Sequence, residues 1–243
     1  MTAPYDLLRA ELSRAGSCPF VTFYDDATGE RVELSIATFD NWVAKTAGLL
    51  RDGLSAQPGD RVALLLPPHW QALVWACAGW AVGTTVLLDP DAAASADVAV
   101  AGPDSVAGAT AAPEVIALSL RPLGGRFTEP LPSGVLDYAV EVPAYPDRLV
   151  PYAAPPDDDR ALEAAGAPSS YGGLVAAAEN RAAAISAGPG SRLLVPATDL
   201  AGALRDALLV PLVIGGSAVL VRNEDPSRRD ARMAAERAGV LVA

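Results

Sequence analysis

The stretch from Gly59 to Pro90 constrains the fold most, because it joins two strand-like runs through a helix-like run with a stop signal after each. Residues 62–66 are an unbroken apolar run, typical of a strand buried on both faces of a parallel sheet. Two prolines follow directly and end that strand, since proline has no N–H group to donate to a neighbouring strand. Residues 84–88 predict the next strand.

Between these strands, residues 70–82 have the length of a helix and almost no polar side chain, so a helix there must be covered on nearly all sides. Trp70, Trp75 and Trp80 lie five residues apart and cannot form one stripe, which indicates contacts on several sides and is compatible with a second subunit as one of them. Gly83 suits the left-handed conformation that ends a helix. Strand, helix and strand in this order predict a doubly wound parallel α/β fold.

Composition limits the class of protein. The chain has 243 residues, 51% of them hydrophobic, enough for one large core or two small α/β units. A net charge of −11 argues against nucleic acid and anionic membranes as partners, because both would repel it. Cys18 and Cys77 have no metal-ligand spacing, which favours a reduced, cytoplasmic protein. The first residues lack a signal-peptide pattern, and the apolar residues 72–88 are short for a membrane span.

Two residue counts limit the chemistry. Lys45 is the only lysine and His69 the only histidine, and arginine rarely transfers protons because its pKa is too high. Lys45 lies off the apolar face of its predicted helix, which indicates a solvated surface lysine. The acidic triplet at residues 157–159 points in several directions, so we expect a solvated linker between lobes rather than a cation site.

The rest of the chain alternates helix-like and strand-like segments. Ser35 is suited to cap the helix that follows it. A proline-rich connection is expected over residues 143–156. The predicted helices are 5–15, 35–50, 171–186, 200–213 and 228–238. The predicted strands are 20–24, 31–34, 98–101, 115–120, 136–142, 193–195, 217–221 and 240–242.

Glycines mark an internal repeat. Gly59 and Gly190 are 131 residues apart (190 − 59), and Gly83 and Gly215 are 132 apart (215 − 83). This period is too long for a solenoid and predicts two similar subdomains. The expected division is a first subdomain over residues 1–156, with the N-terminal helix and hairpin, and a second, shorter one over residues 157–243.

Two residues are candidates for acid–base chemistry. His69 and Asp199 each follow a predicted parallel strand, at the end where ligands bind in open α/β sheets. A His–Asp pair could act as acid and base. Each residue can also cap the helix that follows it, and we favour the two caps because nothing local brings the side chains together.

Other motifs fail on spacing. Ser217 has no glycine two residues later, which a hydrolase nucleophile elbow requires, and residues 188–190 are too short for a dinucleotide-binding loop. We therefore assign no catalytic, cofactor-binding or metal-binding residue.

Five segments carry a resemblance to a known family. Residues 58–67 read Pro-Gly-Asp-Arg-Val-Ala-Leu-Leu-Leu-Pro, and residues 81–90 read Ala-Val-Gly-Thr-Thr-Val-Leu-Leu-Asp-Pro. With residues 34–50, 190–196 and 212–220, they resemble the large N-terminal domain of adenylate-forming enzymes, the superfamily of acyl-CoA synthetases, peptide-synthetase adenylation domains and luciferases. The resemblance implies two parallel-sheet subdomains, and ATP or AMP as ligands by family resemblance alone.

The departures from this family bear on activity. Its phosphate loop, rich in Ser, Thr and Gly and ending in Pro-Lys-Gly, is expected between Asp157 and Tyr171, where backbone N–H groups and a lysine would hold ATP. Residues 161–170 contain no lysine and no glycine cluster. Asp199 stands where many members have an aromatic residue or histidine. The nucleotide motifs and the small domain with the catalytic lysine would lie beyond Ala243, so no active-site residue carries over.

We therefore expect a truncated, degenerate member, a pseudoenzyme that acts as a binding or interaction protein. One alternative is a nucleotide- or acyl-binding ligase whose site a partner chain completes, and another is a purely structural subunit. Residues 208–221 and 239–243 are nearly free of polar groups, so we also expect a homo-oligomer or a protein partner.

Overall fold

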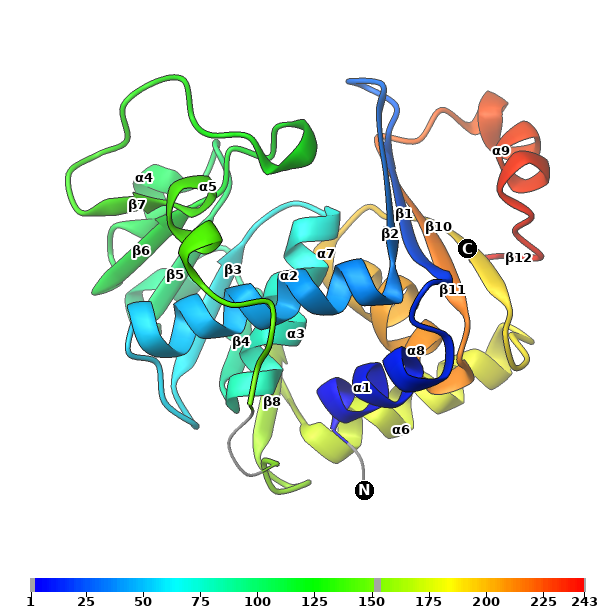
Figure 1. Cartoon of the computed structure of the whole chain (residues 1–243), viewed down its shortest axis with the longest axis horizontal. Helices are drawn as coiled ribbons and strands as arrows, with labels where there is room; N and C mark the ends of the chain where they lie inside the picture. The colour runs from blue at the N-terminus through cyan, green and yellow to red at the C-terminus, as the bar shows by residue number, and fades with distance from the viewer. Residues whose placement is uncertain (1–2, 151–153, 243) are drawn as a thin grey trace.

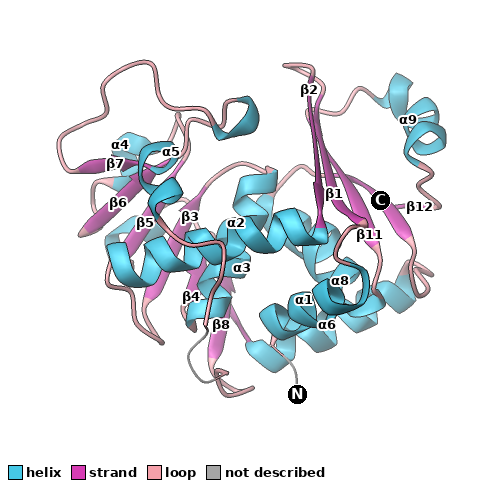
Figure 2. Ribbon diagram, in the orientation of Figure 1, coloured by secondary structure: helices cyan, strands magenta, loops and turns pink. Residues whose placement is uncertain are grey.

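Two sheets stand on either side of a layer of helices in the computed structural model, which describes residues 3–150 and 154–242. Figures 1 and 2 show α1, α2 and α3 in this central layer, with one sheet on each flank. One continuous core runs through the layer and includes Phe20 of one sheet, Val62 of the other and Trp75 between them. The predicted doubly wound α/β fold with two parallel-sheet units is confirmed.

The first sheet has seven strands, all parallel to their neighbours except the last pair. In spatial order they are β7 (Val135–Asp137), β6 (Glu114–Ala117), β5 (Val98–Ala101), β3 (Arg61–Leu65), β4 (Thr85–Leu87), β8 (Arg160–Ala164) and β9 (Ala167–Ser170). Its outer face is lined by alanines and covered by short turns and α4 (Val106–Ala109), because small side chains let the cover lie close.

The second sheet has five strands, and only β1 and β2 pair antiparallel. In order they are β12 (Val240–Leu241), β10 (Arg192–Pro196), β11 (Ser217–Arg222), β1 (Pro19–Asp25) and β2 (Glu30–Ser35). Helix α9 (Arg229–Glu236) packs over the outer face, where Met233 contacts the cluster of Leu194, Val219 and Val221.

The other helices follow the predicted positions within a few residues, except α5, which lies in a segment predicted as a strand. They are α1 (Pro4–Ala15), α2 (Ile36–Gly48) with a π turn (Leu49–Gly53), α3 (Trp70–Val82), α5 (Tyr138–Glu141), α6 (Tyr171–Ala184), and α7 (Leu200–Ala203) with a π turn (Leu204–Leu209) and α8 (Val210–Ile214). Short 3₁₀ turns occupy Ala92–Ser95, Pro122–Gly124, Val142–Ala144 and Pro226–Arg228. The second π turn comes just before Pro211, which has no N–H group for the usual helical bond.

Helix α3 is the centre of the molecule, and all of its residues are buried. Gly83 ends it with a φ of 94°, the predicted left-handed conformation. Trp70, Trp75 and Trp80 are at most 1% exposed, and Trp80 Nε1 donates to the carbonyl of Ala161 in β8. The chain itself therefore supplies the cover that this helix needs.

The two sheets exchange hairpins, which the sequence did not predict. The predicted hairpin β1–β2, in the residues assigned to the first subdomain, pairs with β11 of the second sheet. The hairpin β8–β9, which was not predicted and lies in the residues assigned to the second subdomain, pairs with β4 of the first sheet. The sheets are therefore not divided along the chain at residue 156. The strands that pair with β1 and β8 lie far from them in the chain, so the local sequence contains no signal that identifies these partners.

Two segments differ from their predicted structure. Residues 136–142 form only the end of β7, because the Asp137 carboxylate accepts a hydrogen bond from the Ala139 N–H and starts α5. Residues 151–153 of the proline-rich connection lie outside the described residues, and the part up to Tyr145 packs along α2. Lys45 is half-buried there and its Nζ donates to the carbonyl of Tyr145 at 2.8 Å, so the prediction of a solvated lysine is wrong.

The apolar runs that suggested an uncovered face are mostly buried. Leu208, Leu209 and Val219 are at most 3% exposed, whereas Leu241 is 37% exposed. Association with a second chain stays a prediction. Both cysteines are free, with Cys18 exposed and Cys77 buried. Among the described helices, none combines the length and the apolar character that crossing a bilayer requires.

Candidate functional site

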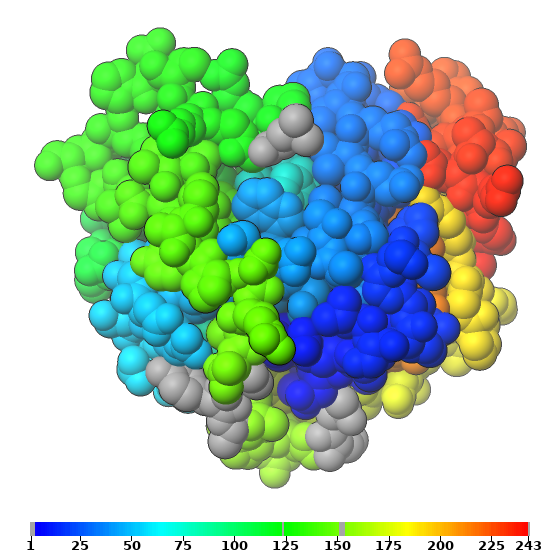
Figure 3. Space-filling view, viewed as in Figure 1, coloured from blue at the N-terminus to red at the C-terminus, as the bar shows by residue number. Residues whose placement is uncertain are grey.

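The carboxyl ends of strands from both sheets meet at one crevice of about 690 Å³. Open α/β sheets bind ligands at this edge. The loops after β3, β5 and β6 form one wall, and the ends of β1 and β11 with the start of β2 form the other. Figure 3 shows the surface indented at the top of the molecule, between the green segments of the first wall and the blue β1–β2 hairpin.

A buried acid lines this crevice, and a buried imidazole lies next to the acid. Glu30, at the start of β2, lines it, and its side chain is only 5% exposed. His69 Nε2 lies 3.9 Å from Glu30 Oε2, too far for a direct hydrogen bond. Neither His69 Nε2 nor Glu30 Oε1 has a hydrogen-bond partner among the residues described. Buried polar atoms normally have one, so this pair can accept a group from the crevice.

The position of the proton on His69 follows from its other nitrogen. Nδ1 accepts a hydrogen bond from the Gln71 N–H at 3.2 Å, so in the neutral ring the proton is on Nε2, facing Glu30. Burial lowers the pKa of His69, and this outweighs the opposing effect of the Glu30 carboxylate. His69 is therefore a neutral hydrogen-bond donor near pH 7.

The carboxylate of Asp25 closes the base of the second wall. It accepts hydrogen bonds from Asn223 Nδ2 and the Ala27 N–H, both at 2.9 Å, and Arg222 approaches to 3.9 Å. These bonds join the end of β1 to the end of β11. The crevice thus presents a carboxylate and arginines on a rigid frame, a set that can bind polar ligand groups.

The structure does not pair His69 with Asp199. His69 caps α3, and Asp199 caps α7 by accepting the Gly202 N–H at 2.8 Å, so the prediction of two helix caps is confirmed. The acid that His69 does approach is Glu30, which the sequence analysis missed. The two are 39 residues apart (69 − 30), one at the start of β2 in the second sheet and the other before α3, and no local pattern connects them.

A two-residue turn occupies the place expected for the phosphate loop. Strands β8 and β9 are joined by Ala165 and Gly166, whose φ angles of 50° and 70° define a tight hairpin turn. Asp89 Oδ1 accepts the Ala165 N–H at 2.8 Å, and Oδ2 accepts the Gly166 N–H at 3.3 Å. The turn is too short to surround a phosphate, and its N–H groups already bind a carboxylate.

The acidic triplet leads into this hairpin. The carbonyls of Asp157 and Asp159 accept the N–H groups of Gly172 and Tyr171, so the triplet is tied to the start of α6 and is not a free linker. Within residues 3–150 and 154–242, no cluster of three or more metal-ligating side chains could hold an ion.

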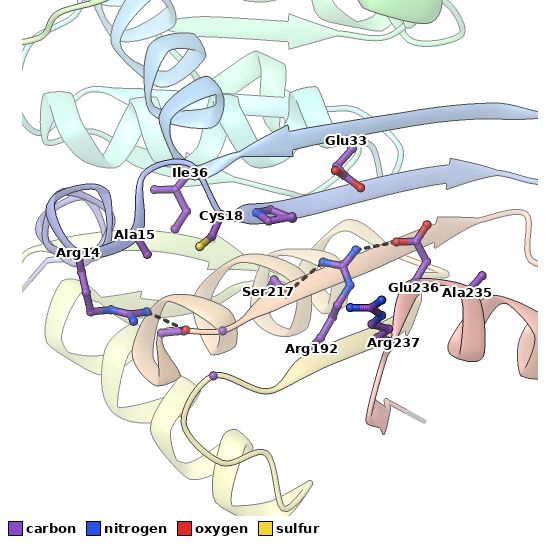
Figure 4. Close-up of a pocket in the computed structure, with 14 residues that line it drawn as sticks. Arg14, Ala15, Cys18, Glu33, Ile36, Arg192, Ser217, Ala235, Glu236 and Arg237 are labelled. Carbon is purple, nitrogen blue, oxygen red and sulfur yellow. Dashed lines mark hydrogen bonds and ion pairs between the residues drawn. The ribbon is translucent and has the colours of Figure 1, made fainter.

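A second pocket, of about 480 Å³, lies at the amino ends of β1, β10 and β11. Figure 4 shows Arg192 at its centre, with hydrogen bonds to Ser217 and Glu236, and Arg14 bonded to the Gly215 carbonyl. It is at the opposite edge of the second sheet from the crevice and shares no lining residue with it.

Comparison with solved structures defines the class of fold. An acyl-CoA synthetase from Brucella canis superposes with a TM-score of 0.77 at 17% identity, covering 97% of this chain and 46% of that one. The N-terminal domain of FACL13 from Mycobacterium tuberculosis gives 0.73 at 17% identity, covering 98% and 62%. The chain therefore has the fold of the N-terminal domain of acyl-CoA synthetases, as the resemblance implied, and spans about half to three-fifths of those solved chains.

A relative with a higher sequence identity shows the family. A "TIGR03089 family protein" of Mycobacterium tuberculosis (strain H37Rv) is 40% identical over 232 residues, which cover 90% of this chain and 89% of the relative. The chain belongs to the TIGR03089 family. No protein-family model matches the sequence.

Proposed function

We propose that this chain is a non-adenylating, ligand-binding protein built on the acyl-CoA synthetase N-terminal fold. The observation that carries the proposal is the turn between β8 and β9, where Asp89 binds the backbone N–H groups of Ala165 and Gly166. A phosphate-binding loop needs several free N–H groups directed at the anion. Here two residues form the whole loop.

The negative charge around this turn also disfavours the binding of ATP. Asp89, Asp91 and Glu163 line a pocket of about 260 Å³ beside the turn, with Arg61 as the one basic side chain among its lining residues. Arg61 approaches Glu163 at 3.7 Å, so part of its charge is already neutralised. Removing the groups that stabilise phosphoryl charge typically costs about 3–4 kcal/mol, or orders of magnitude in rate.

The crevice between the sheets is the site that we propose for binding. Its Glu30 carboxylate has an oxygen without a partner among the described residues, and His69 lies behind it as a neutral donor. A ligand hydroxyl can donate to the carboxylate and accept from the imidazole, which leaves neither group unsatisfied. This favours a small ligand that carries a hydroxyl or similar group.

Calorimetry and pyrophosphate exchange test the two halves of the proposal. We expect no pyrophosphate exchange with ATP and carboxylic acids. We expect heat of binding for at least one of coenzyme A, a medium-chain acyl-CoA or AMP, reduced in Glu30→Gln. Asp104→Asn, which removes an exposed acid elsewhere on the crevice lining, is the matched control.

Each half can fail separately. Exchange above background that a substitution in this chain abolishes would contradict the absence of adenylation. Exchange that appears only with a second protein would favour a ligase completed by a partner chain. Absence of binding for every compound would favour a purely structural subunit.

A further inference from the structure

The pocket at the amino ends of β1, β10 and β11 concentrates positive charge in an acidic protein. Three arginines line it, namely Arg14 at the end of α1, Arg192 at the start of β10 and Arg237 after α9. The chain as a whole carries a net charge of −11. Whether this group carries free positive charge depends on the carboxylates around it.

The glutamates nearby do not neutralise all of this charge. Glu11 pairs with Arg14, and Glu236 binds Arg192 at 2.7 Å. The third, Glu33, pairs with Arg31 at 2.8 Å, and Arg31 also reaches Glu236. The three carboxylates are therefore paired with Arg14, Arg31 and Arg192.

The guanidinium of Arg237 is the surplus charge. It has no ion pair or side-chain hydrogen bond to any residue that the structure describes, and it is exposed. Its backbone is left-handed, with φ of 53° at the end of α9, a position that ordinarily favours glycine. Figure 4 shows its side chain in the pocket beside that of Arg192.

Arg192 offers a further unused donor. Its two terminal nitrogens donate to Ser217 Oγ at 3.1 Å, Thr22 Oγ1 at 2.8 Å and Glu236, whereas its Nε is buried and without a partner among the described residues. These bonds fix the guanidinium in the wall of the pocket, so no rotamer freedom is lost when an anion binds.

We propose that this pocket binds the phosphate group of a small molecule. Guanidinium groups recognise phosphate through charge-assisted hydrogen bonds. Here Arg237, after α9, supplies the free charge, while the paired Arg14 of α1 and Arg192 of β10 line the same pocket from two other directions. Donors that converge from three elements suit an anion with three or four oxygens better than a planar carboxylate. A cavity of about 480 Å³ has room for the rest of a small phosphorylated compound.

Calorimetry with inorganic phosphate and pyrophosphate at low ionic strength is the direct test. We expect saturable binding that Arg237→Gln weakens by roughly tenfold or more, because it removes a charge-assisted hydrogen bond. The variant should fold normally, since this side chain bonds to no described residue. Arg228→Gln, the same change of charge at an arginine that is 61% exposed before α9, should bind as the parent does.

Cys18 gives a second readout, because it lines the same pocket and the other cysteine is buried. Phosphate should slow its reaction with the anionic disulfide reagent dithiobisnitrobenzoate more than its reaction with neutral dithiodipyridine. Because AMP and coenzyme A also carry phosphate groups, each is titrated into Arg237→Gln and into Glu30→Gln: weakening by the first variant places the ligand in this pocket and weakening by the second places it in the crevice, so the two proposals fail independently.

Three results would overturn the inference. The first is no saturable binding of phosphate or pyrophosphate. The second is equal weakening in Arg237→Gln and Arg228→Gln, which would indicate a general effect of charge. The third is equal affinity for acetate, which would exclude selection of a phosphate group.

Discussion

Two tryptophans on α3 allow the contribution of one hydrogen bond to stability to be measured against a matched control. Trp80 and Trp75 are both fully buried, but only Trp80 has a partner for its indole N–H, the Ala161 carbonyl at 2.8 Å. Trp75 Nε1 is buried with no partner among the described residues. Replacement of each by phenylalanine removes the same atoms and leaves a similar cavity.

The hydrogen bond therefore determines the difference in stability between the two variants. Trp80→Phe takes the indole donor from a buried carbonyl, at a cost of about 1–3 kcal/mol. Trp75→Phe removes an N–H that was already unsatisfied, so it loses packing but no hydrogen bond. We expect Trp80→Phe to lower the free energy of unfolding by about 2 kcal/mol more than Trp75→Phe. In a chain of this size the extra loss corresponds to roughly 4–8 °C in Tm.

Urea unfolding followed by far-UV circular dichroism measures this difference without relying on tryptophan fluorescence. The slope of the transition should be equal in the two variants, since both unfold the same surface. Equal destabilisation, or a larger loss in Trp75→Phe, would refute the reasoning, because it would mean that packing and not the bond to β8 sets the cost.

Three further predictions concern caps and charges. The single histidine gives one imidazole Hε1 signal in proton NMR, and its chemical shift should titrate below the ordinary pKa of about 6.5, since burial lowers the pKa of His69; titration at or above that pH would contradict its burial. Asp199→Ala should lower the stability by about 1 kcal/mol through loss of the α7 cap, and no loss in thermal unfolding would show that the cap is replaced. Burial opposes the ionisation of Asp206, but hydrogen bonds from Arg205 and Arg181 outweigh it and lower its pKa. Its contribution is therefore complete above the unfolded pKa of about 4 and is lost as the pH falls further, and Asp206→Asn should flatten this part of the acid-unfolding curve.

Local patterns predicted the elements well where one physical cause dominates. The strand at 62–66, helix α3 and the left-handed Gly83 followed from an apolar run, a nearly nonpolar helix and a glycine. Ser35, His69 and Asp199 cap helices because their side chains reach the N–H groups of the first turn.

Long-range pairing was out of reach of the same reasoning. Nothing local in residues 19–35 says that β1 pairs with β11, about 200 residues later, rather than with a strand nearby. For the same reason Glu30 could not be placed beside His69, or Asp89 beside the turn at Ala165. The candidate site consists largely of such contacts, and only its location at the carboxyl ends of strands was predictable.

Two features should prevent the turn between β8 and β9 from binding ATP, namely the short loop and the negative charge of Asp89. The Asp89→Asn variant separates them. The amide keeps an oxygen that can accept one of the two backbone N–H groups, so the turn should persist with a loss of about 1 kcal/mol. The negative charge at the turn is gone, but the loop still consists of Ala165 and Gly166. If the length of the loop is the main obstacle, calorimetry should detect no ATP binding at this site, measured in an Arg237→Gln background. Binding of ATP by the double variant, and not by Arg237→Gln alone, would contradict this ranking, since it would make the carboxylate the main obstacle and the short loop a minor one.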